Sequence, residues 1–142
     1  MASREEIADF IAAEFPQTRV VIEDVGDRGA TVSLDTGEAD LRPGGTVSGP
    51  TLMAVADVAL YVAVLGAIGI VPLAVTTSLT INFLRKPESH KRVIGKCALM
   101  KVGRSLVTGE VALYSEGVAD PVAHVVGTYS VPPSGARQTG SR

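Results

Sequence analysis

The pattern of apolar and polar positions divides the 142-residue chain into a short helix, two strands, one long helix and four more strands. Residues 3–14 carry an apolar stripe at helical spacing, and a serine followed three residues later by a glutamate predicts a capping box at the start of this helix. Residues 18–26 and 29–36 predict two strands around a Gly-Asp turn. Turn sequences separate the last four apolar stretches, which predict strands over residues 73–84, 91–102, 105–114 and 121–131.

The long segment over residues 50–71 is almost entirely apolar and contains a single charged residue, Asp57. Its length would allow a membrane-spanning helix. A buried helix of a soluble domain is favoured instead, because a charge near the middle of a membrane span costs several kcal/mol. The four strands that follow also need an apolar partner, and this helix is the only large apolar element available. The expected fold is therefore α+β, with a curved antiparallel sheet wrapped around a long central helix.

Composition supports one folded domain over residues 1–131, with residues 1–15 as its N-terminal helix and residues 132–142 as a disordered tail. The chain is 46% hydrophobic and 20% charged, which excludes a disordered protein. A single cysteine excludes an internal disulfide framework and a cysteine-based zinc site. The acidic start lacks the pattern of a signal peptide, so we expect a cytoplasmic location.

Charge is unevenly distributed along the chain. The net charge of −2 argues against general affinity for nucleic acid. Residues 85–104 nevertheless contain one acid and many bases. These bases could form a positive patch for a small polyanion, or they could simply be solvated at strand edges and turns. These bases are Arg85, Lys86, Lys91, Arg92, Lys96, Lys101 and Arg104.

The start of the long helix predicts a site for an oxyanion. Pro50 suits the first helical position, which places Gly49 at the N-cap, where free N–H groups and the helix dipole favour negative charge. Asp57 follows Gly49 by eight residues, or roughly 12 Å along a helix. One reacting carbonyl cannot contact both residues of the same helix. The spacing therefore predicts a two-fold dimer, in which two antiparallel central helices form two sites at their interface.

The stretch "SGPTLMAVAD" and the later runs "TTSLTINFLRKP", "GRSL" and "PVAHVVGTYS" resemble the PaaI-like acyl-CoA thioesterases of the hotdog fold, over about residues 18–131. In this frame Ser48 replaces the family histidine and Pro50 replaces a glycine. Arg42 stands where the family often has an asparagine. Gly49 and Asp57 match the family positions, and Thr76 lies near a family Ser or Thr that helps hold water.

The resemblance implies hydrolysis of an acyl-CoA to a carboxylic acid and free CoA, without a metal or cofactor. Asp57 would act as general base or nucleophile, the Gly49 N–H would bind the oxyanion, and Thr76 would assist. The alternative for Asp57 is a structural acid paired with a base. Candidate substrate-binding residues are Arg42, Ser48, Met53 and Tyr61, and candidate ligands of the CoA phosphates are Arg85, Lys86 and Arg104. Ser48 could instead cap the helix, and Tyr61 could simply pack in the core.

Other functions are open at this point. The missing family histidine would also suit a hotdog protein that binds acyl-CoA without turnover. A hydratase is disfavoured, because His90 and His124 lie far along the chain from the central helix. We expect self-association as a homodimer, with a dimer of dimers as the higher assembly, and no nucleic-acid or membrane partner.

Overall fold

The structure of the protein is a computed structural model that describes residues 1–132. The elements along the chain are α1 (Arg4–Glu14), β1 (Val21–Gly26), β2 (Gly29–Leu34), the 3-10 helix η1 (Glu38–Asp40), α2 (Gly49–Ile68), β3 (Val75–Phe83), β4 (Val93–Val102), β5 (Leu106–Ser115) and β6 (Ala123–Ser130). All the predicted helices and strands are present, with ends that shift by a few residues at most. From residue 133 onward the predicted tail lies outside the described residues.

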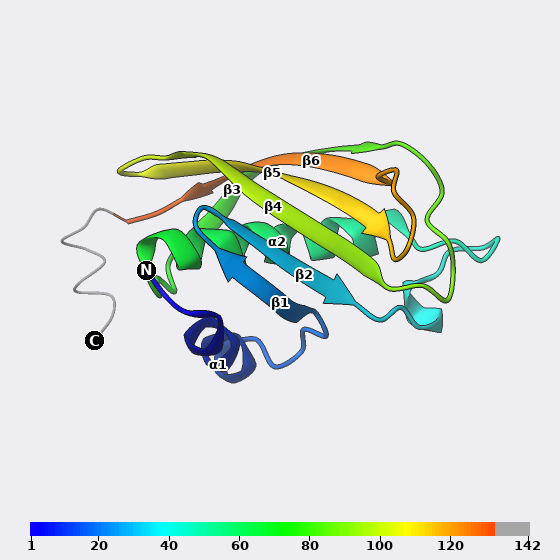
Figure 1. The fold of residues 1–142 in the computed structure, drawn as a ribbon, viewed down its shortest axis with the longest axis horizontal. Helices are drawn as coiled ribbons and strands as arrows, with labels where there is room; N and C mark the ends of the chain where they lie inside the picture. Colours follow the sequence, from blue (N-terminus) through cyan, green and yellow to red (C-terminus); the bar gives the residue numbers. More distant parts are fainter. Residues whose placement is uncertain (133–142) are drawn as a thin grey trace.

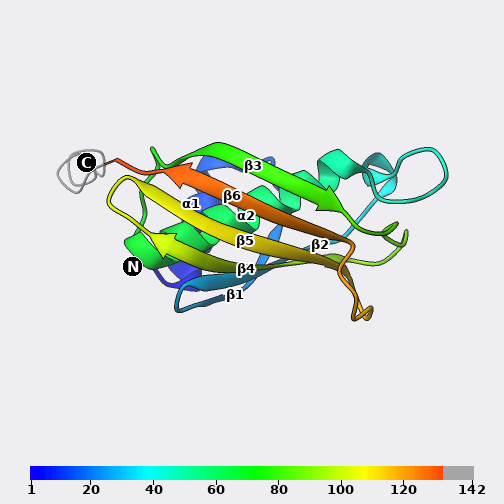
Figure 2. The ribbon, with the colours of Figure 1, turned by 90° about the horizontal axis from the view of Figure 1, so that it is seen from above.

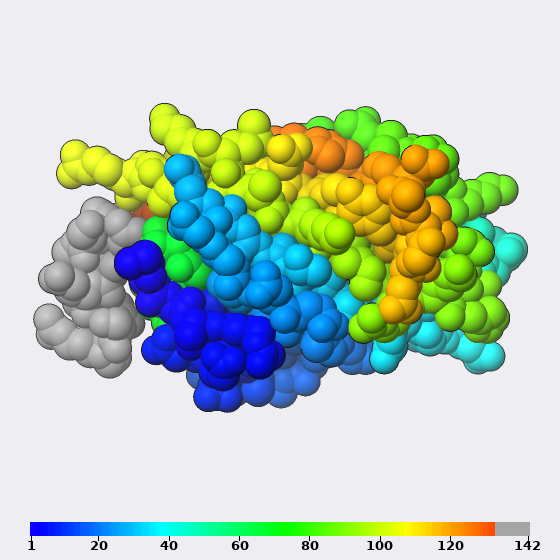
Figure 3. Space-filling model, viewed as in Figure 1, coloured from blue at the N-terminus to red at the C-terminus, as the bar shows by residue number. Residues whose placement is uncertain are grey.

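The six strands form one sheet in the order β1-β2-β4-β5-β6-β3, and all neighbouring strands are antiparallel. The sheet curves around α2, which lies along its inner face (Figure 1 and Figure 2). The first residues of the chain, α1 included, pack beside the β1–β2 hairpin at one flank (Figure 3). This arrangement confirms the predicted hotdog fold.

Helix α2 supplies the centre of the core. Half of its 20 residues are buried, so a helix that is long and apolar enough to cross a membrane here packs against the sheet. Two glycines that face each other on β5 and β6 allow the close approach. A Cβ at Gly109 would lie 2.9 Å from Leu60, and one at Gly127 would lie 2.6 Å from the same side chain. The large Leu60 therefore needs glycine on both strands.

The start of α2 differs by one residue from the prediction. Ser48, not Gly49, is the N-cap: its Oγ accepts the Thr51 N–H at 3.3 Å and bonds the Thr51 Oγ1 at 3.0 Å. Gly49 is then the first helical residue and Pro50 the second, where a missing N–H still costs nothing.

The loop between β2 and α2 has defined local structure. It contains η1 and a bridge between Leu41 and Val47. Asp40 is 5% exposed and fixes this loop, because its carboxylate accepts hydrogen bonds from the Gly37 N–H at 2.8 Å, from Arg19 at 2.7 Å and from Thr51 at 3.3 Å. Burial opposes the charge, but these donors outweigh it and lower the pKa of Asp40.

Strand β3 is an edge strand whose side chains are mostly exposed, in contrast to the alternating burial of β4 and β5. Large apolar side chains are among them: Val75, Phe83 and the neighbouring Leu73 and Leu84 are each more than half exposed. A long apolar edge of this kind invites pairing with another strand.

Candidate active site

Asp57 is held by two hydroxyl groups. Its Oδ1 accepts a hydrogen bond from Thr76 Oγ1 at 2.7 Å and another from the Tyr129 hydroxyl at 2.8 Å. The Tyr129 hydroxyl also lies 3.2 Å from the main-chain oxygen of Asp57. No other described residue bonds to the carboxylate. Within one subunit, therefore, Asp57 does not form the alternative ion pair with a base such as Arg42.

Three elements bring these groups together. Asp57 lies in the middle of α2, Thr76 near the start of β3, and Tyr129 near the end of β6. Thr76 and Tyr129 face each other across the antiparallel β3–β6 pair, so their side chains lie on the same face of the sheet. The register shift in β3 follows immediately, between Thr76 and Ser78. The strand pairing therefore aims two hydroxyl groups at one point of the central helix.

An apolar cavity of about 520 Å³ opens beside Asp57. Its walls come from α1 and the residues just after it, from α2, and from the start of β3. The lining residues are Ile11, Phe15, Gln17, Thr18, Ala54, Asp57, Val58, Tyr61, Pro72, Ala74, Val75, Thr76 and Tyr129. We call this cavity the Asp57 pocket. Its composition suits an apolar group with one polar centre at the carboxylate.

Two stacked tyrosines form part of this wall. The rings of Tyr61 and Tyr129 lie 5.7 Å apart with 20° between their planes, and Phe15 meets Tyr61 edge-on at 5.9 Å. Burial raises the pKa of Tyr61 to about 12, with a contribution from Glu14. Burial and the negative charge of Asp57 raise the pKa of Tyr129 well above its ordinary value. The Tyr61 hydroxyl is buried and has no hydrogen-bond partner among residues 1–132.

Gly49 lies in a separate, basic hollow of about 380 Å³, which we call the Gly49 pocket. Its lining residues are Arg42, Thr46, Val47, Gly49, Leu52, Phe83, Leu84, Arg85, Lys86 and Pro87. Within the described part of the chain, nothing accepts the Gly49 N–H. The Phe83 ring covers Gly49 so closely that a Cβ at this position would lie 3.2 Å from it. The free N–H and the nearby bases make this pocket suited to negative charge.

The predicted site residues thus divide between two pockets of one subunit. Asp57, Thr76 and Tyr61 line the first, and Gly49, Arg42, Arg85 and Lys86 line the second. Ser48 is engaged in capping α2. Met53 is 38% exposed on α2 and does not line the Asp57 pocket, although it lies one turn before Asp57.

Arg104 does not join the other two predicted phosphate ligands. It lies in the turn between β4 and β5, next to the start of β5 at Leu106. Arg85 bonds the main chain of Pro121 near the opposite end of that strand. A ten-residue strand is roughly 30 Å long, so Arg104 cannot bind the same phosphate as Arg85 within one subunit.

The sequence reasoning missed Tyr129. Its only signal is its inward position in the alternating pattern of the last strand, which a core tyrosine would share.

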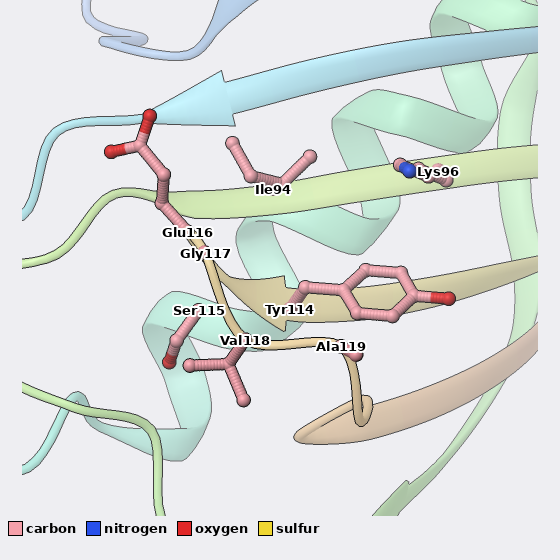
Figure 4. A pocket seen from close by; sticks show the side chains of 8 residues that line it. All are labelled: Ile94, Lys96, Tyr114, Ser115, Glu116, Gly117, Val118 and Ala119. Carbon is pink, nitrogen blue, oxygen red and sulfur yellow. The ribbon is translucent and has the colours of Figure 1, made fainter.

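A third hollow lies on the outer face of the sheet, away from α2, and is lined by residues of β4, β5 and the turn after β5 (Figure 4). There the Lys96 ammonium lies 5.3 Å from the centre of the Tyr114 ring. None of the predicted site residues lines it. Among residues 1–132, no three His, Cys, Asp or Glu side chains lie together as a possible metal site.

Comparison with known proteins decides the family. The model of the thioesterase superfamily matches residues 44–121, which is more than half of the chain and includes Gly49, Asp57 and Thr76. The chain belongs to the thioesterase superfamily. A solved structure named as a candidate thioesterase, from Silicibacter sp. TM1040, is 41% identical, with 92% of each chain covered and a TM-score of 0.85.

Less similar solved structures share the fold. The PaaI protein of the phenylacetic acid degradation operon of E. coli is 17% identical over 91% of this chain and 93% of its own, with a TM-score of 0.80. A mutant of the PaaI protein from Thermus thermophilus is 24% identical over 87% and 99%, with a TM-score of 0.72. No curated protein matches the chain. The predictions of a PaaI-like hotdog protein and of a thioesterase are confirmed.

Proposed function

We propose that this thioesterase hydrolyses acyl-CoA to a carboxylic acid and free CoA at two sites on the interface of a homodimer. The observation that carries the proposal is the carboxylate of Asp57. Its Oδ1 is occupied by two hydroxyl donors, whereas its Oδ2 has no partner among the described residues and the side chain lines an apolar cavity. A half-buried carboxylate with one free oxygen is suited to activate water or to attack a carbonyl carbon.

The proposed reaction uses groups from both pockets. The acyl chain occupies the Asp57 pocket, and the thioester oxygen accepts the N–H of Gly49 of the partner subunit. Asp57 takes a proton from a water molecule, and the oxygen of that water attacks the carbonyl carbon. The Gly49 N–H stabilises the negative charge that forms on the carbonyl oxygen. Collapse of the intermediate breaks the C–S bond, and the CoA thiolate leaves and takes up a proton. In the alternative course an oxygen of Asp57 attacks the carbonyl carbon, the C–S bond breaks as the CoA thiolate leaves and takes up a proton, and water hydrolyses the resulting mixed anhydride to the carboxylic acid and free Asp57.

The exposed edge of β3 supports a two-fold assembly. The Asp57 pocket borders the start of this strand at Val75 and Thr76, and the Gly49 pocket borders its end at Phe83. Antiparallel pairing of two β3 strands would place the start of one beside the end of the other. Each Asp57 pocket would then adjoin the Gly49 pocket of the partner subunit, and the exposed apolar side chains of β3 would be covered.

The bases of the Gly49 pocket support CoA as the leaving group. Arg42, Arg85 and Lys86 line this pocket, and their charged groups are suited to pair with phosphate oxygens. Arg104 could contribute to a phosphate site only from the other subunit, because its end of β5 lies at the same end of the sheet as the start of β3, with β6 between them. A dimer of dimers is part of the same proposal.

An assay over a panel of acyl-CoA thioesters tests the proposed function. We expect the wild type to release free thiol and Asp57→Asn to lose roughly 100- to 10,000-fold in kcat, as expected for removal of a general base. Addition of EDTA should leave the wild-type rate unchanged, because no step uses a metal. If Asp57→Asn hydrolyses every substrate as fast as the wild type, the proposed mechanism is wrong.

The second candidate is a protein that binds acyl-CoA without turnover. The replacement of the family histidine and asparagine by Ser48 and Arg42 favours it. It predicts saturable acyl-CoA binding with no thiol release by the wild type over the whole panel, whereas turnover that depends on Asp57 would exclude it.

A further inference from the structure

Tyr129 contacts the proposed catalytic acid but lies outside residues 44–121, the part of the chain that the family model matches. We propose that Tyr129 is a positioning residue: its hydroxyl fixes Oδ1 of Asp57 and so leaves Oδ2 as the oxygen that reacts. This inference rests on the proposed hydrolysis of acyl-CoA and adds to it the choice between the two oxygens of one carboxylate.

The two oxygens of the Asp57 carboxylate differ in their hydrogen bonds. A carboxylate oxygen has about two lone-pair sites for donors. Thr76 and Tyr129 fill both sites on Oδ1, at 2.7 and 2.8 Å. Oδ2 has no partner within residues 1–132, so its lone pairs are available to a water molecule or to a carbonyl carbon. The two oxygens of Asp57 are therefore chemically different before substrate arrives.

The side chain of Tyr129 is firmly held. The residue is only 3% exposed, and its ring stacks on Tyr61. Its hydroxyl lies within reach of both the carboxylate and the main-chain oxygen of Asp57, so the side chain is tied to the helix that carries it. Thr76, in contrast, is exposed on the edge strand. Tyr129 is thus the more firmly held of the two donors.

The direction of the hydrogen bond is also fixed. Burial, with the negative charge of Asp57, raises the pKa of Tyr129 well above its ordinary value, so the phenol keeps its proton over the pH range of an enzyme assay. A protonated phenol beside a carboxylate donates. Asp57 therefore keeps this donor in alkaline as well as neutral solution.

The variant Tyr129→Phe tests the inference, because it keeps the ring and its stacking and removes only the hydroxyl. We expect kcat to fall about 10- to 100-fold, as for a catalytic group that is misplaced by about 1 Å. KM should change less than about threefold, since the acyl and CoA contacts remain. The matched control is Tyr114→Phe, which removes the same atom from the outer face of the sheet and should keep the wild-type kcat.

Measurement of Asp57→Asn in the same experiment separates the two levels of the proposal. If Asp57→Asn is as active as the wild type, the proposed function fails. If Asp57→Asn is inactive and Tyr129→Phe retains wild-type kcat, only the role of Tyr129 is overturned. A rise in KM at unchanged kcat would also overturn it, because that pattern indicates a binding residue.

A second measurement applies if Tyr129→Phe does not fold. In the wild type, the hydroxyl proton of Tyr129 should give a downfield, slowly exchanging NMR signal, because it is buried and bonded to a carboxylate. This signal should move upfield in Asp57→Ala. A Tyr129 hydroxyl signal that does not respond to Asp57→Ala would overturn the inference.

Discussion

The Asp57 pocket and the Gly49 pocket lie along the same edge strand and have opposite chemistry. The first is apolar and aromatic, and its acid is held by hydroxyl donors. The second is basic, and it presents a free backbone N–H at the start of a 20-residue helix. The first contains a carboxylate, and the second contains a free backbone N–H but no acid. In the proposed function each pocket supplies half of one site, so the dimer is the proposed unit of catalysis.

In the proposed function, this difference also assigns the two ends of the substrate to different pockets. An acyl group gains by leaving water for the Asp57 pocket, whereas the phosphates of CoA gain by meeting the bases of the Gly49 pocket. Only the thioester itself has to contact both. Changes in one pocket should therefore alter recognition of one end of the substrate, and changes at the thioester contacts should alter the rate.

After loss of the Asp57 carboxylate itself, the largest effect should come from removing the donor at Gly49. Gly49→Pro deletes the N–H at a helical position that tolerates proline, and Ser48 before it has the extended ψ of 154° that proline requires. We expect kcat to fall about 100- to 1,000-fold, the usual cost of one oxyanion donor. Steady-state kinetics measure this loss of kcat, with the acyl-CoA that the wild type hydrolyses fastest as the substrate.

Gly49→Ala is the matched control for this change. It adds the same Cβ beside the exposed Phe83 ring but keeps the N–H, so it should be at least about tenfold more active than Gly49→Pro. Equal losses in the two variants would show that space, and not the donor, matters at Gly49.

The bases of the Gly49 pocket should affect binding of CoA. In the double variant Arg85→Gln, Lys86→Gln we expect KM for acyl-CoA to rise about 10- to 100-fold, because two charge-assisted contacts are lost. KM for the corresponding acyl-pantetheine thioester, which lacks the nucleotide, should stay the same. Lys101→Gln on β4 is the control for charge alone. A parallel rise in KM for both substrates would remove the phosphate role.

Asp40 tests the stability of the loop that carries the Gly49 pocket. Asp40→Asn should lower the free energy of unfolding by about 1–2 kcal/mol at pH 7, because a buried carboxylate with three donors loses its charge. The pKa of Asp40 is lowered in the folded state. Its stabilisation is therefore complete above the unfolded-state pKa of about 3.9 and is lost as pH falls through the lower folded value.

Urea unfolding of wild type and Asp40→Asn at pH 7 and at pH 3 measures this difference. The gap between the two proteins should shrink at pH 3. A gap that is the same at both pH values would mean that the charge of Asp40 contributes nothing.

The smallest effect is expected at Tyr61, in the other pocket. Its buried hydroxyl has no partner among the described residues, so Tyr61→Phe should leave the free energy of unfolding unchanged or raise it by up to about 1 kcal/mol. Tyr129→Phe, which removes a bonded hydroxyl from the neighbouring ring, should lower it by about 1–2 kcal/mol. Thermal and urea unfolding compare the two. A larger loss for Tyr61→Phe would point to a polar partner for its hydroxyl.

Much of the fold could be predicted from the sequence, because the alternation of apolar residues and the turn signals are local. The same holds for the spacing of Gly49 and Asp57 on one helix, which correctly predicted that they lie in separate places in one subunit. The predicted N-cap was wrong by one residue. The hydroxyl of Ser48 caps the helix, and Gly49 is its first helical residue.

The contacts that could not be predicted are those between distant segments. Tyr129 reaches Asp57 from 72 residues away, through a strand pairing that puts it opposite Thr76. Arg104 is close to Arg85 in sequence, but the intervening strand β4 carries the chain to the other end of the sheet. Met53 lies one turn before Asp57, yet the residues of α2 that line the Asp57 pocket are Ala54, Asp57, Val58 and Tyr61.

Subunit mixing tests the shared site most directly. Asp57→Asn and Gly49→Pro, each inactive alone, are mixed in equal amounts under conditions that exchange subunits, and native mass spectrometry measures the heterodimer. If Asp57 of one subunit acts with Gly49 of the other, each heterodimer contains one intact site, and the mixture should recover roughly a quarter of wild-type kcat. A mixture that contains heterodimer but stays as inactive as the separate variants would contradict the account.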